Sequence, residues 1–335
     1  MFGLSIIIVN YKSLQLISEC IKSIQKFGIN CDHEIIIVNN DASDIGKTFI
    51  QDLDPKVIWC EMGYNAGFAR ANNRGIEFSK YNTILLLNPD TIILNDAINK
   101  CFSQFAYSDY VACGVQLLNP DLTNQISGSK FFTAGLNYLL PIPYLGVCLK
   151  SVASFFHINP PHVKKASMIS EVEWINGAFI MIKKEAISKA GLLDEEFFLY
   201  AEEIEWCFRL SKIGKLVILG DSQVVHLVSG TIQAVTKSSD NSYSNLFDRK
   251  GSQLLVSNHL MILKTYGSLI FSFHLLSHTF GSMINILLIP MEYLFLRNSF
   301  YAISNKSLFY FRNVLMVWKL LPYYFSRKPH FFKVI

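Results

Sequence analysis

The sequence lacks the short signatures of several common protein classes. No G-x-G-x-x-G and no G-x-x-x-x-G-K-[S/T] is present, so the phosphate cradles of dinucleotide-binding and P-loop proteins are missing. Internal repeats and low-complexity tracts are also missing. The seven cysteines contain no C-x-x-C pair and are typical of reduced core thiols in a cytosolic protein: Cys20, Cys31, Cys60, Cys101, Cys113, Cys148 and Cys207.

Acidic residues are missing from the C-terminal tail. None follows Glu292, whereas seven basic residues do: Arg297, Lys306, Arg312, Lys319, Arg327, Lys328 and Lys333. Without those seven, 23 basic residues stand against 26 acidic ones, so the net charge is −3 in the rest of the chain and +7 in the tail. This asymmetry indicates an anionic partner for the tail, either a membrane surface or a nucleic acid.

A second stretch, the 27 residues from Thr265 to Met291, lacks charged side chains and is long enough to span a bilayer. On a helix its side chains separate into a polar side (Ser268, Ser272, His278, Thr279, Ser282, Asn285) and an apolar side (Leu269, Phe273, Leu276, Phe280, Ile284, Leu287). The split predicts a helix that lies in the membrane interface or packs on the protein, with a span at about 267–289 as the alternative. Beside such a segment we expect the basic, aromatic tail to meet an anionic membrane surface and no nucleic acid.

The N-terminal two thirds of the chain alternate between strand and helix patterns. Unbroken apolar runs predict buried strands at 5–9, 34–38 and 83–87, with a weaker strand at 57–60, and apolar residues at helical spacing predict helices at 15–27 and 96–107. Such alternation predicts a doubly wound α/β domain. Further on, the pattern weakens over 111–169, where the apolar, aromatic segment 131–158 reads as a loop or short helices. It then predicts a strand at 179–182, helices at 184–190 and 202–212, and short strands at 216–219 and 224–225.

Polar residues follow three of the predicted parallel strands, at the point where each strand ends. They are Val9-Asn10-Tyr11, the turn 39–44, and Asn88-Pro89-Asp90, where proline must end the strand. Open α/β sheets bind their ligands in the crevice outside these carboxyl ends. The sequence therefore predicts a nucleotide crevice at this edge of the sheet.

Six motifs in a fixed order carry a resemblance to a known family. They are Ser5–Tyr11, Val38–Asp44, Asn65–Gly75, Leu87–Thr91, Trp174–Ala178 and Gly191–Arg209. The chain resembles the inverting GT-A-fold glycosyltransferases of family two, and among them the bacterial rhamnosyltransferases that build O-antigen and related polysaccharides. The resemblance implies a GT-A catalytic domain over 1–231, with a nucleotide-sugar half at about 1–110 and an acceptor half at about 111–231. Residues 232–335 then form a helical, membrane-associated region.

The resemblance implies a nucleotide-sugar site along the strand ends and the glycine-bearing segment after the weak strand. Its residues would be Val9, Asn10, Tyr11, Asn39, Asn40, Asn65, Gly67, Phe68, Asn72, Asn88 and Asp90. At Asn39 the family commonly has aspartate, which accepts from a pyrimidine N3–H, and an asparagine carbonyl can accept the same bond without charge. Arg70 and Arg74 are candidate phosphate partners.

A divalent cation, Mg²⁺ or Mn²⁺, is implied beside the diphosphate, because oxygen-ligated cations neutralise the charge that builds on that leaving group. By resemblance Asp90 holds this cation and His226 supplies a further contact. The family's acidic motif has a second carboxylate where this chain has Asn88. Asp90 is therefore expected to hold the cation together with the donor's diphosphate.

The stretch Glu202-Glu203-Ile204-Glu205 matches the position of the family's catalytic carboxylates, with glutamate in all three acidic places. Inverting transfer needs one base that takes the proton of the acceptor hydroxyl. We expect Glu203 to be that base, with Glu202 as the alternative. Glu205 would orient or bind the acceptor and pair with Arg209, four residues on. The resemblance also implies an acceptor and sugar pocket formed by Trp174, Asn176, Gly177 and Arg209.

The expected activity is transfer of a sugar from a nucleoside-diphosphate donor, with dTDP-rhamnose favoured and a UDP-sugar as the alternative. The acceptor would be a polyprenyl-diphosphate-linked glycan that the segment 131–158 helps to receive. The expected place is the cytoplasmic face of a bacterial inner membrane, with peripheral or monotopic attachment. Asn39, Asn88 and the all-glutamate motif leave a third reading, a catalytically inactive membrane scaffold that binds nucleotide sugars.

Overall fold

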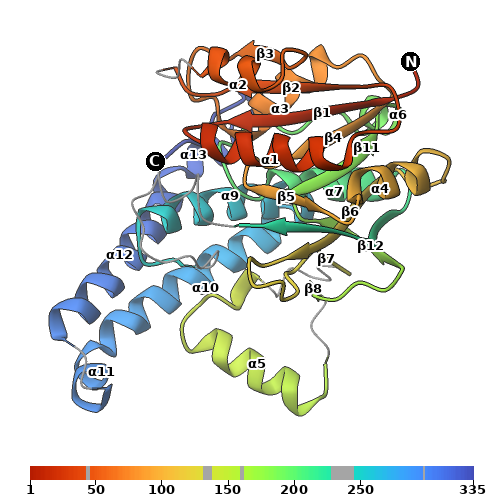
Figure 1. Ribbon diagram of the computed structural model, residues 1–335. Helices are drawn as coiled ribbons and strands as arrows, with labels where there is room; N and C mark the ends of the chain where they lie inside the picture. Colours follow the sequence, from red (N-terminus) through yellow and green to blue (C-terminus); the bar gives the residue numbers. More distant parts are fainter. Residues whose placement is uncertain (43–45, 131–137, 159–161, 228–244, 297–298) are drawn as a thin grey trace. The chain divides into compact units, whose positions relative to one another are not determined.

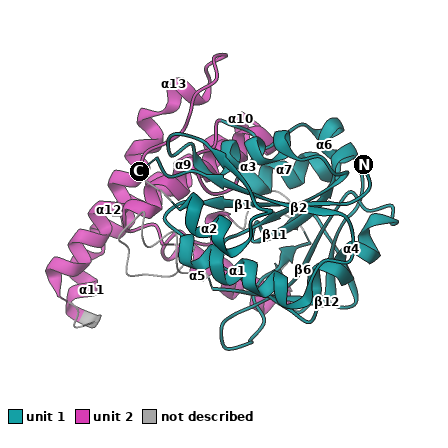
Figure 2. Cartoon of the chain, turned by 45° about the horizontal axis from the view of Figure 1, so that its top comes forward, with its two compact units in different colours: residues 1–131, 161–195, 202–235 teal, residues 132–160, 196–201, 236–335 magenta. Residues whose placement is uncertain are grey.

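The computed structural model describes residues 1–42, 46–130, 138–158, 162–227, 245–296 and 299–335 (Figure 1). Parts of the predicted turn 39–44 and of the apolar segment 131–158 therefore lie outside the described residues. The chain divides into two compact units (Figure 2). Unit 1 comprises residues 1–131, 161–195 and 202–235, and unit 2 comprises 132–160, 196–201 and 236–335.

A mixed sheet runs through unit 1 (Figure 1). Its strand order is β3 (Ile58–Glu61), β2 (His33–Asn39), β1 (Leu4–Asn10), β4 (Thr83–Leu87), β11 (Phe179–Lys183), β6 (Ala112–Leu118), β12 (Leu216–His226), β5 (Thr91–Leu94), and β9 (Ile169–Val172) pairs with β12 as well. The first four strands are parallel, whereas β11 is antiparallel to both of its neighbours. A small second sheet joins β10 (Trp174–Ile175), β7 (Gly128–Ser129) and β8 (His162–Val163).

Helices cover both faces of the main sheet, and the strands are apolar on both sides for that reason. The helices of unit 1 are α1 (Leu14–Phe27), α2 (Lys47–Leu53), α3 (Gly67–Phe78), α4 (Ala97–Ala106), α6 (Lys184–Ala190) and α7 (Glu202–Ser211). Along β1, Ile6 and Ile8 join the core under α1 and α4, while Ile7 joins the core under α3 and α7. Gly75 allows α3 to approach closely, because a Cβ there would lie 2.4 Å from the Ile7 side chain.

The predicted strands at 5–9, 34–38, 57–60, 83–87 and 179–182 are confirmed, as are the predicted helices of unit 1. Strands β5, β6 and β9, the strands of the small second sheet, and helices α2 and α3 were not predicted. The apolar pattern of β6 is interrupted by Gly114 and Gln116, and β5 has only four residues directly after the Asn88–Asp90 turn. The two short strands expected near 216–225 form one strand, β12, whose register shifts between Leu219 and Gln223.

The described part of unit 2 is mainly helical. It contains α5 (Leu145–Phe155), α9 (Arg249–Tyr266), α10 (Ser268–Leu287), α11 (Ile289–Leu296), α12 (Phe300–Lys319) and α13 (Leu321–Tyr324), and α9, α10 and α12 pack on one another. The segment after α13 is hydrogen-bonded to the rest of this unit. The Phe332 N–H donates to the Glu196 carbonyl at 2.9 Å, and the Gln253 side chain donates to the Phe332 carbonyl at 2.9 Å.

Helix α10 exposes its predicted apolar side and buries three residues of its predicted polar side. His278, Ser282 and Asn285 are buried, whereas Leu269 and Leu287 are 81% and 75% exposed. Phe273, Leu276, Phe280 and Ile284 are exposed as well. The predicted apolar side is thus exposed, whereas the predicted polar side is buried only in part, because Ser268 and Ser272 are exposed and Thr279 is half-buried. An exposed apolar side is the reverse of a surface helix in a water-soluble protein.

Candidate active site

The last residues of three neighbouring parallel strands form one hydrogen-bonded row. The register places Asn10 beside Asn39 and Asn39 beside Glu61. The Asn10 side-chain amide donates to Asn39 Oδ1 at 2.9 Å, and Asn39 Nδ2 donates to Glu61 Oε2 at 2.8 Å. Val9 and Tyr11, also predicted here, are half-buried. The row therefore lies where an open α/β sheet binds its ligand.

The loop that follows β3 is built by two asparagines and leads into α3. Asn40 Oδ1 accepts from the Ala66 N–H at 2.8 Å, and Asn65 Oδ1 accepts from the Gly67 N–H at 3.2 Å. Gly67 has a φ of 84°, a left-handed conformation that favours glycine. Phe68 is half-buried in the first turn of the helix. Three of the predicted nucleotide-site residues (Asn40, Asn65 and Gly67) are thus joined at the α3 N-terminus.

The remaining polar residues of α3 hold the helix and its surroundings together. Asn72 is buried and donates to the Phe68 carbonyl one turn earlier, at 3.0 Å. Asn73, expected with Asn72 to line the diphosphate and ribose, exchanges hydrogen bonds with the Leu193 backbone and donates to Glu195 Oε1 at 3.1 Å.

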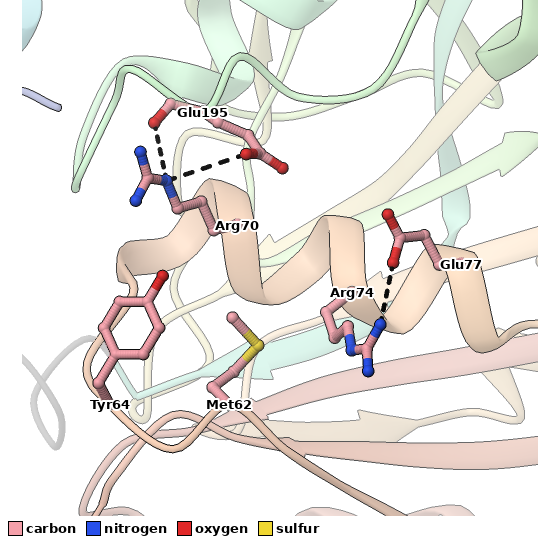
Figure 3. Close-up of a pocket in the computed structure, with 6 residues that line it drawn as sticks. All are labelled: Met62, Tyr64, Arg70, Arg74, Glu77 and Glu195. Atoms are coloured by element: carbon pink, nitrogen blue, oxygen red, sulfur yellow. Dashed lines mark hydrogen bonds and ion pairs between the residues drawn. The ribbon is translucent and has the colours of Figure 1, made fainter. Parts of the chain in front are cut away.

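A pocket of about 170 Å³ opens beside α3 (Figure 3). It is lined by Met62, Tyr64, Arg70, Arg74, Glu77 and Glu195. Each arginine contacts a carboxylate there, Arg70 with Glu195 at 3.9 Å and Arg74 with Glu77 at 3.3 Å. A phosphate bound by either arginine would therefore compete with a carboxylate already in contact.

Asp90 and His226 come together because β5 and β12 are antiparallel with Thr91 opposite His226. The distance from Asp90 Oδ1 to His226 Nε2 is 3.4 Å, and both side chains are at most one-tenth exposed. The other ring nitrogen, Nδ1, lies 2.8 Å from Gln125 Oε1. The Gln125 amide nitrogen donates to Asn119 Oδ1 at 2.9 Å, so its oxygen faces the ring and accepts from Nδ1–H. Nε2 is therefore the ring nitrogen that faces Asp90.

The Asp90–His226 pair fits one side of a divalent cation. A carboxylate oxygen and an imidazole lone pair converge, and the second ring nitrogen is held by a carbonyl oxygen, as in many metal sites. Among the residues that the structure describes, no three His, Cys, Asp or Glu side chains gather closely enough to hold a metal ion by themselves. Further ligands would have to come from a bound diphosphate or from water.

The end of β4 and the start of β11 bring the acceptor-side motif to the same edge of the sheet. Half-buried Asn88 donates its N–H to the Ala178 carbonyl at 3.0 Å. The Asn176 side chain donates to the Ile126 carbonyl at 3.2 Å and accepts from the Ala178 N–H at 3.0 Å, which fixes the turn around Gly177. A Cβ at Gly177 would lie 3.5 Å from Glu203 Cγ, so α7 lies directly against this turn.

Glu202 and Glu203 begin α7 in contrasting surroundings. Glu202 is 3% exposed, its Oε2 has no hydrogen-bond partner among the described residues, and burial together with the Glu203 charge raises its pKa well above the usual range. Glu203 is half-buried, and burial raises its pKa to about 7, opposed by backbone hydrogen bonds and by the Trp174 side chain. At neutral pH Glu202 therefore keeps its proton, while Glu203 is poised between its two forms.

Glu205 forms an ion pair within the helix. Arg209 donates to both of its oxygens, at 2.8 and 2.7 Å, which confirms the predicted i,i+4 pair. The same guanidinium donates to the Ala190 and Leu192 carbonyls. The contacts of this pair thus tie α7 to the end of α6.

Two polar residues of this edge have no counterpart among the predicted site residues. Gln125 lies in a stretch with no regular pattern, and its contact with His226 spans 101 residues, so no local signal reveals it. Glu61 ends the weak strand β3, and the rule that polar residues past strand ends mark ligand sites could have found it.

The sequence profile of a family described as "Glycosyl transferase family 2" matches residues 5–160. The low-salt glycan biosynthesis hexosyltransferase Agl10 of Haloferax volcanii is 27% identical over 266 residues, which are 77% of this chain and 76% of that protein. The dTDP-rhamnosyl transferase RfbF of Shigella flexneri is 24% identical over 248 residues, 71% of this chain and 76% of that protein.

A solved structure similar to this fold is that of the mannosyltransferase PcManGT from Pyrobaculum calidifontis in complex with GDP-Man and Mn²⁺. The TM-score is 0.52 with 13% identity, over 94% of this chain and 86% of that one. At this identity the likeness concerns the fold alone, and it agrees with the GT-A expectation.

Proposed function

The chain is a glycosyltransferase with a family 2 domain, and from this premise we propose an inverting sugar transfer from a nucleoside diphosphate to a lipid-linked glycan. The observation that carries the proposal is Glu203, a carboxylate with a pKa near neutrality at the sheet edge that also holds Asp90 and His226. Rhamnose from dTDP-rhamnose is the favoured sugar, and a UDP-sugar is the alternative.

The nucleotide lies along the carboxyl ends of β1, β2 and β4 in this proposal. Asn10, Asn39 and Asn40 form the floor of the base and ribose site. The backbone N–H groups that follow Gly67 lie at the N-terminus of α3, where the partial positive charge of a helix favours phosphate.

Asp90 and His226 hold a divalent cation beside the diphosphate. One carboxylate oxygen and one imidazole nitrogen suit Mn²⁺, which accepts nitrogen ligands more readily than Mg²⁺ does. The bound cation supplies Lewis-acid neutralisation of the charge on the departing nucleoside diphosphate. Gln125 keeps the proton of His226 on Nδ1, so that Nε2 stays available as a ligand.

Glu203 takes the proton of the acceptor hydroxyl as that oxygen attacks the sugar. A base with a pKa of about 7 combines a large ionised fraction at neutral pH with useful basicity. Glu202 is held neutral beside it and places no second charge in the site. Trp174, Asn176 and Gly177 shape the pocket above Glu203, and the Glu205–Arg209 pair holds the helix in position.

Unit 2 attaches the enzyme to the cytoplasmic face of a bacterial inner membrane, where a polyprenyl-diphosphate-linked acceptor is found. Among the described residues α10 is the one helix long and apolar enough to cross a bilayer. Its buried polar side favours a monotopic arrangement over a lone span, since a span would expose that side to lipid. Exposed cations near it suit anionic headgroups: Lys306, Arg312, Lys319, Arg327 and Lys328.

The test is a panel of labelled donors (dTDP-rhamnose, UDP-galactose, UDP-GlcNAc and GDP-mannose) incubated with purified protein and Mn²⁺ or Mg²⁺. We expect transfer to a lipid-linked acceptor, or slow hydrolysis, with one donor, and dTDP-rhamnose is favoured. Nucleotide binding without turnover of any donor would support the inactive scaffold and contradict the proposal.

A further inference from the structure

The predicted base-reading residue, Asn39, has no hydrogen-bonding capacity left. It is 1% exposed, and its Oδ1 accepts from Asn10 Nδ2 at 2.9 Å and from the Asp41 N–H at 3.3 Å. Its Nδ2 donates to the Asp41 carbonyl at 3.1 Å and to Glu61 at 2.8 Å. An amide has two acceptor sites and two donors, and all four are in use.

Glu61 ends the same row and does have capacity. The side chain belongs to an exposed residue, and its two oxygens accept from different partners, Oε2 from Asn39 and Oε1 from Trp59 Nε1 at 2.5 Å. An ionised carboxylate offers about four acceptor sites, so each oxygen keeps one. The two fixed donors also hold the carboxylate in one orientation at the carboxyl end of β3.

We infer that Glu61 reads the base of the donor nucleotide, with Asn39 as a positioning residue that orients it. The inference rests on the proposed function, since it assumes that a nucleotide occupies the strand ends. A carboxylate accepts hydrogen bonds and donates none, so it selects a base whose pairing edge carries a ring N–H. Uracil and thymine present N3–H, and guanine presents N1–H beside its amino group. Cytosine and adenine present an exocyclic amino group beside an unprotonated ring nitrogen, and a carboxylate that faces the ring nitrogen is repelled by it.

Asparagine at position 39 suits a carboxylate at position 61. With aspartate at position 39, two carboxylates would face each other at the distance now bridged by Asn39 Nδ2 and Glu61 Oε2. Like charges at such a distance disfavour ionisation of both groups. Asparagine at 39 with glutamate at 61 leaves one negative acceptor in the row, at the end of β3.

The experiment measures the Kd of UDP, dTDP, GDP, CDP and ADP by calorimetry, with Mn²⁺ present, for the wild type and for Glu61→Gln. The wild type should bind UDP, dTDP or GDP more tightly than CDP and ADP. Which of the three binds most tightly distinguishes a uracil or thymine site from a guanine site. Glu61→Gln should raise the Kd of the preferred nucleotide by about tenfold, the effect of losing a hydrogen bond to a charged group. CDP and ADP should bind Glu61→Gln as well as, or better than, the wild type, because an amide can donate to their ring nitrogen.

Two further variants keep the result interpretable. Glu19→Gln makes the same chemical change at an exposed position of α1 and should leave every Kd unchanged. Trp59→Phe removes one hydrogen bond to the Glu61 carboxylate and should raise the Kd of the preferred nucleotide by a smaller factor than Glu61→Gln does.

Two results would overturn the inference. A wild-type preference for CDP or ADP, or a preferred nucleotide that binds Glu61→Gln within twofold of the wild type, would show that Glu61 does not read the base while leaving the glycosyltransferase proposal intact. A wild-type protein that binds none of the five nucleotides would overturn the proposed function and this inference with it.

Discussion

Asp90 Oδ1 and His226 Nε2 lie 3.4 Å apart, although 136 positions separate the two residues in the sequence. The antiparallel pairing of β5 with β12 produces this approach, because Thr91 and His226 are opposite each other. The proposed two-ligand cation site therefore results from the register of the sheet, and the proposed mechanism can be tested at these residues.

Asp90→Asn should raise the Mn²⁺ concentration needed for half-maximal donor turnover by at least about tenfold, since a neutral amide oxygen is a weaker ligand than a carboxylate. Mn²⁺ titration of turnover, with calorimetry of Mn²⁺ in the presence of the nucleotide, measures the effect. Asp109→Asn, at an exposed position, is the control and should behave as the wild type. Unchanged cation dependence in Asp90→Asn would contradict the site.

Gln125→Leu should weaken Mn²⁺ binding by about tenfold, because loss of the Nδ1 partner releases the ring and its tautomer. Gln125→Glu retains an oxygen that accepts from Nδ1–H and should restore most of the affinity. A purely structural role would instead lower the thermal stability of both variants without separating them in the Mn²⁺ titration.

The sheet edge that carries these residues was largely predictable, and the reason is burial. Strands such as Thr83–Leu87 are covered on both faces, so they read as unbroken apolar runs whose ends are marked by polar turns. Strand β6 was missed because Gly114 and Gln116 break that run. Gly114 leaves room for the Ile175 side chain, since a Cβ at this glycine would lie 2.5 Å from it. The Gln116 amide bonds to the Ser127 hydroxyl and to nearby carbonyls, contacts that no local pattern encodes.

The candidate site was predictable only as a set of strand-end residues. The sequence indicates Asn39 as a base contact, whereas its saturation by Asn10, Asp41 and Glu61 follows from strand register. Likewise the sequence leaves Glu202 and Glu203 as alternatives. Their burial separates them, because only tertiary packing decides which carboxylate is enclosed and which remains accessible.

The stability of the fold should fall as the pH rises from about 4.5 to above 7. In the unfolded chain both glutamates release their protons near the ordinary glutamate pKa of 4.5, whereas in the fold the pKa of Glu202 is raised well above that value and the pKa of Glu203 is raised to about 7. The folded state then binds more protons than the unfolded state over this range, so unfolding becomes easier with increasing pH.

Glu202→Gln removes one of the two titrating groups. Its unfolding midpoint should therefore fall less between pH 5 and pH 8 than that of the wild type, by a few degrees, since about 1 kcal/mol corresponds to ~2–4 °C in a domain of this size. Thermal unfolding followed by circular dichroism measures both proteins. An equal fall of the unfolding midpoint in the wild type and in Glu202→Gln between pH 5 and pH 8 would mean that Glu202 does not hold a proton in the folded state.

The double variant Phe280→Gln, Leu287→Gln should bind anionic liposomes about a hundredfold more weakly than the wild type, because each large apolar side chain moved out of the interface costs ~1.5 kcal/mol and about 1.4 kcal/mol is a factor of ten in affinity. Both side chains are exposed on α10, at 62% and 75%, so their replacement leaves the helix packing intact. Phe49→Gln, at a 47% exposed position of α2, is the matched control. Equal co-sedimentation of the double variant and the control would contradict the proposed membrane face.

The most direct test of the proposed mechanism compares Glu203→Gln with Glu202→Gln in steady-state transfer and in nucleotide binding. Glu203→Gln should lower kcat by about 10²–10⁴-fold, the usual contribution of a general base, with the Kd of the nucleotide within about twofold of the wild type. Glu202→Gln should keep most of the activity. In Glu202→Gln and in the wild type alike, kcat should increase with pH and pass through its inflection near pH 7, where Glu203 loses its proton. Full activity in Glu203→Gln, or its loss in Glu202→Gln alone, would contradict the assignment of Glu203 as the base.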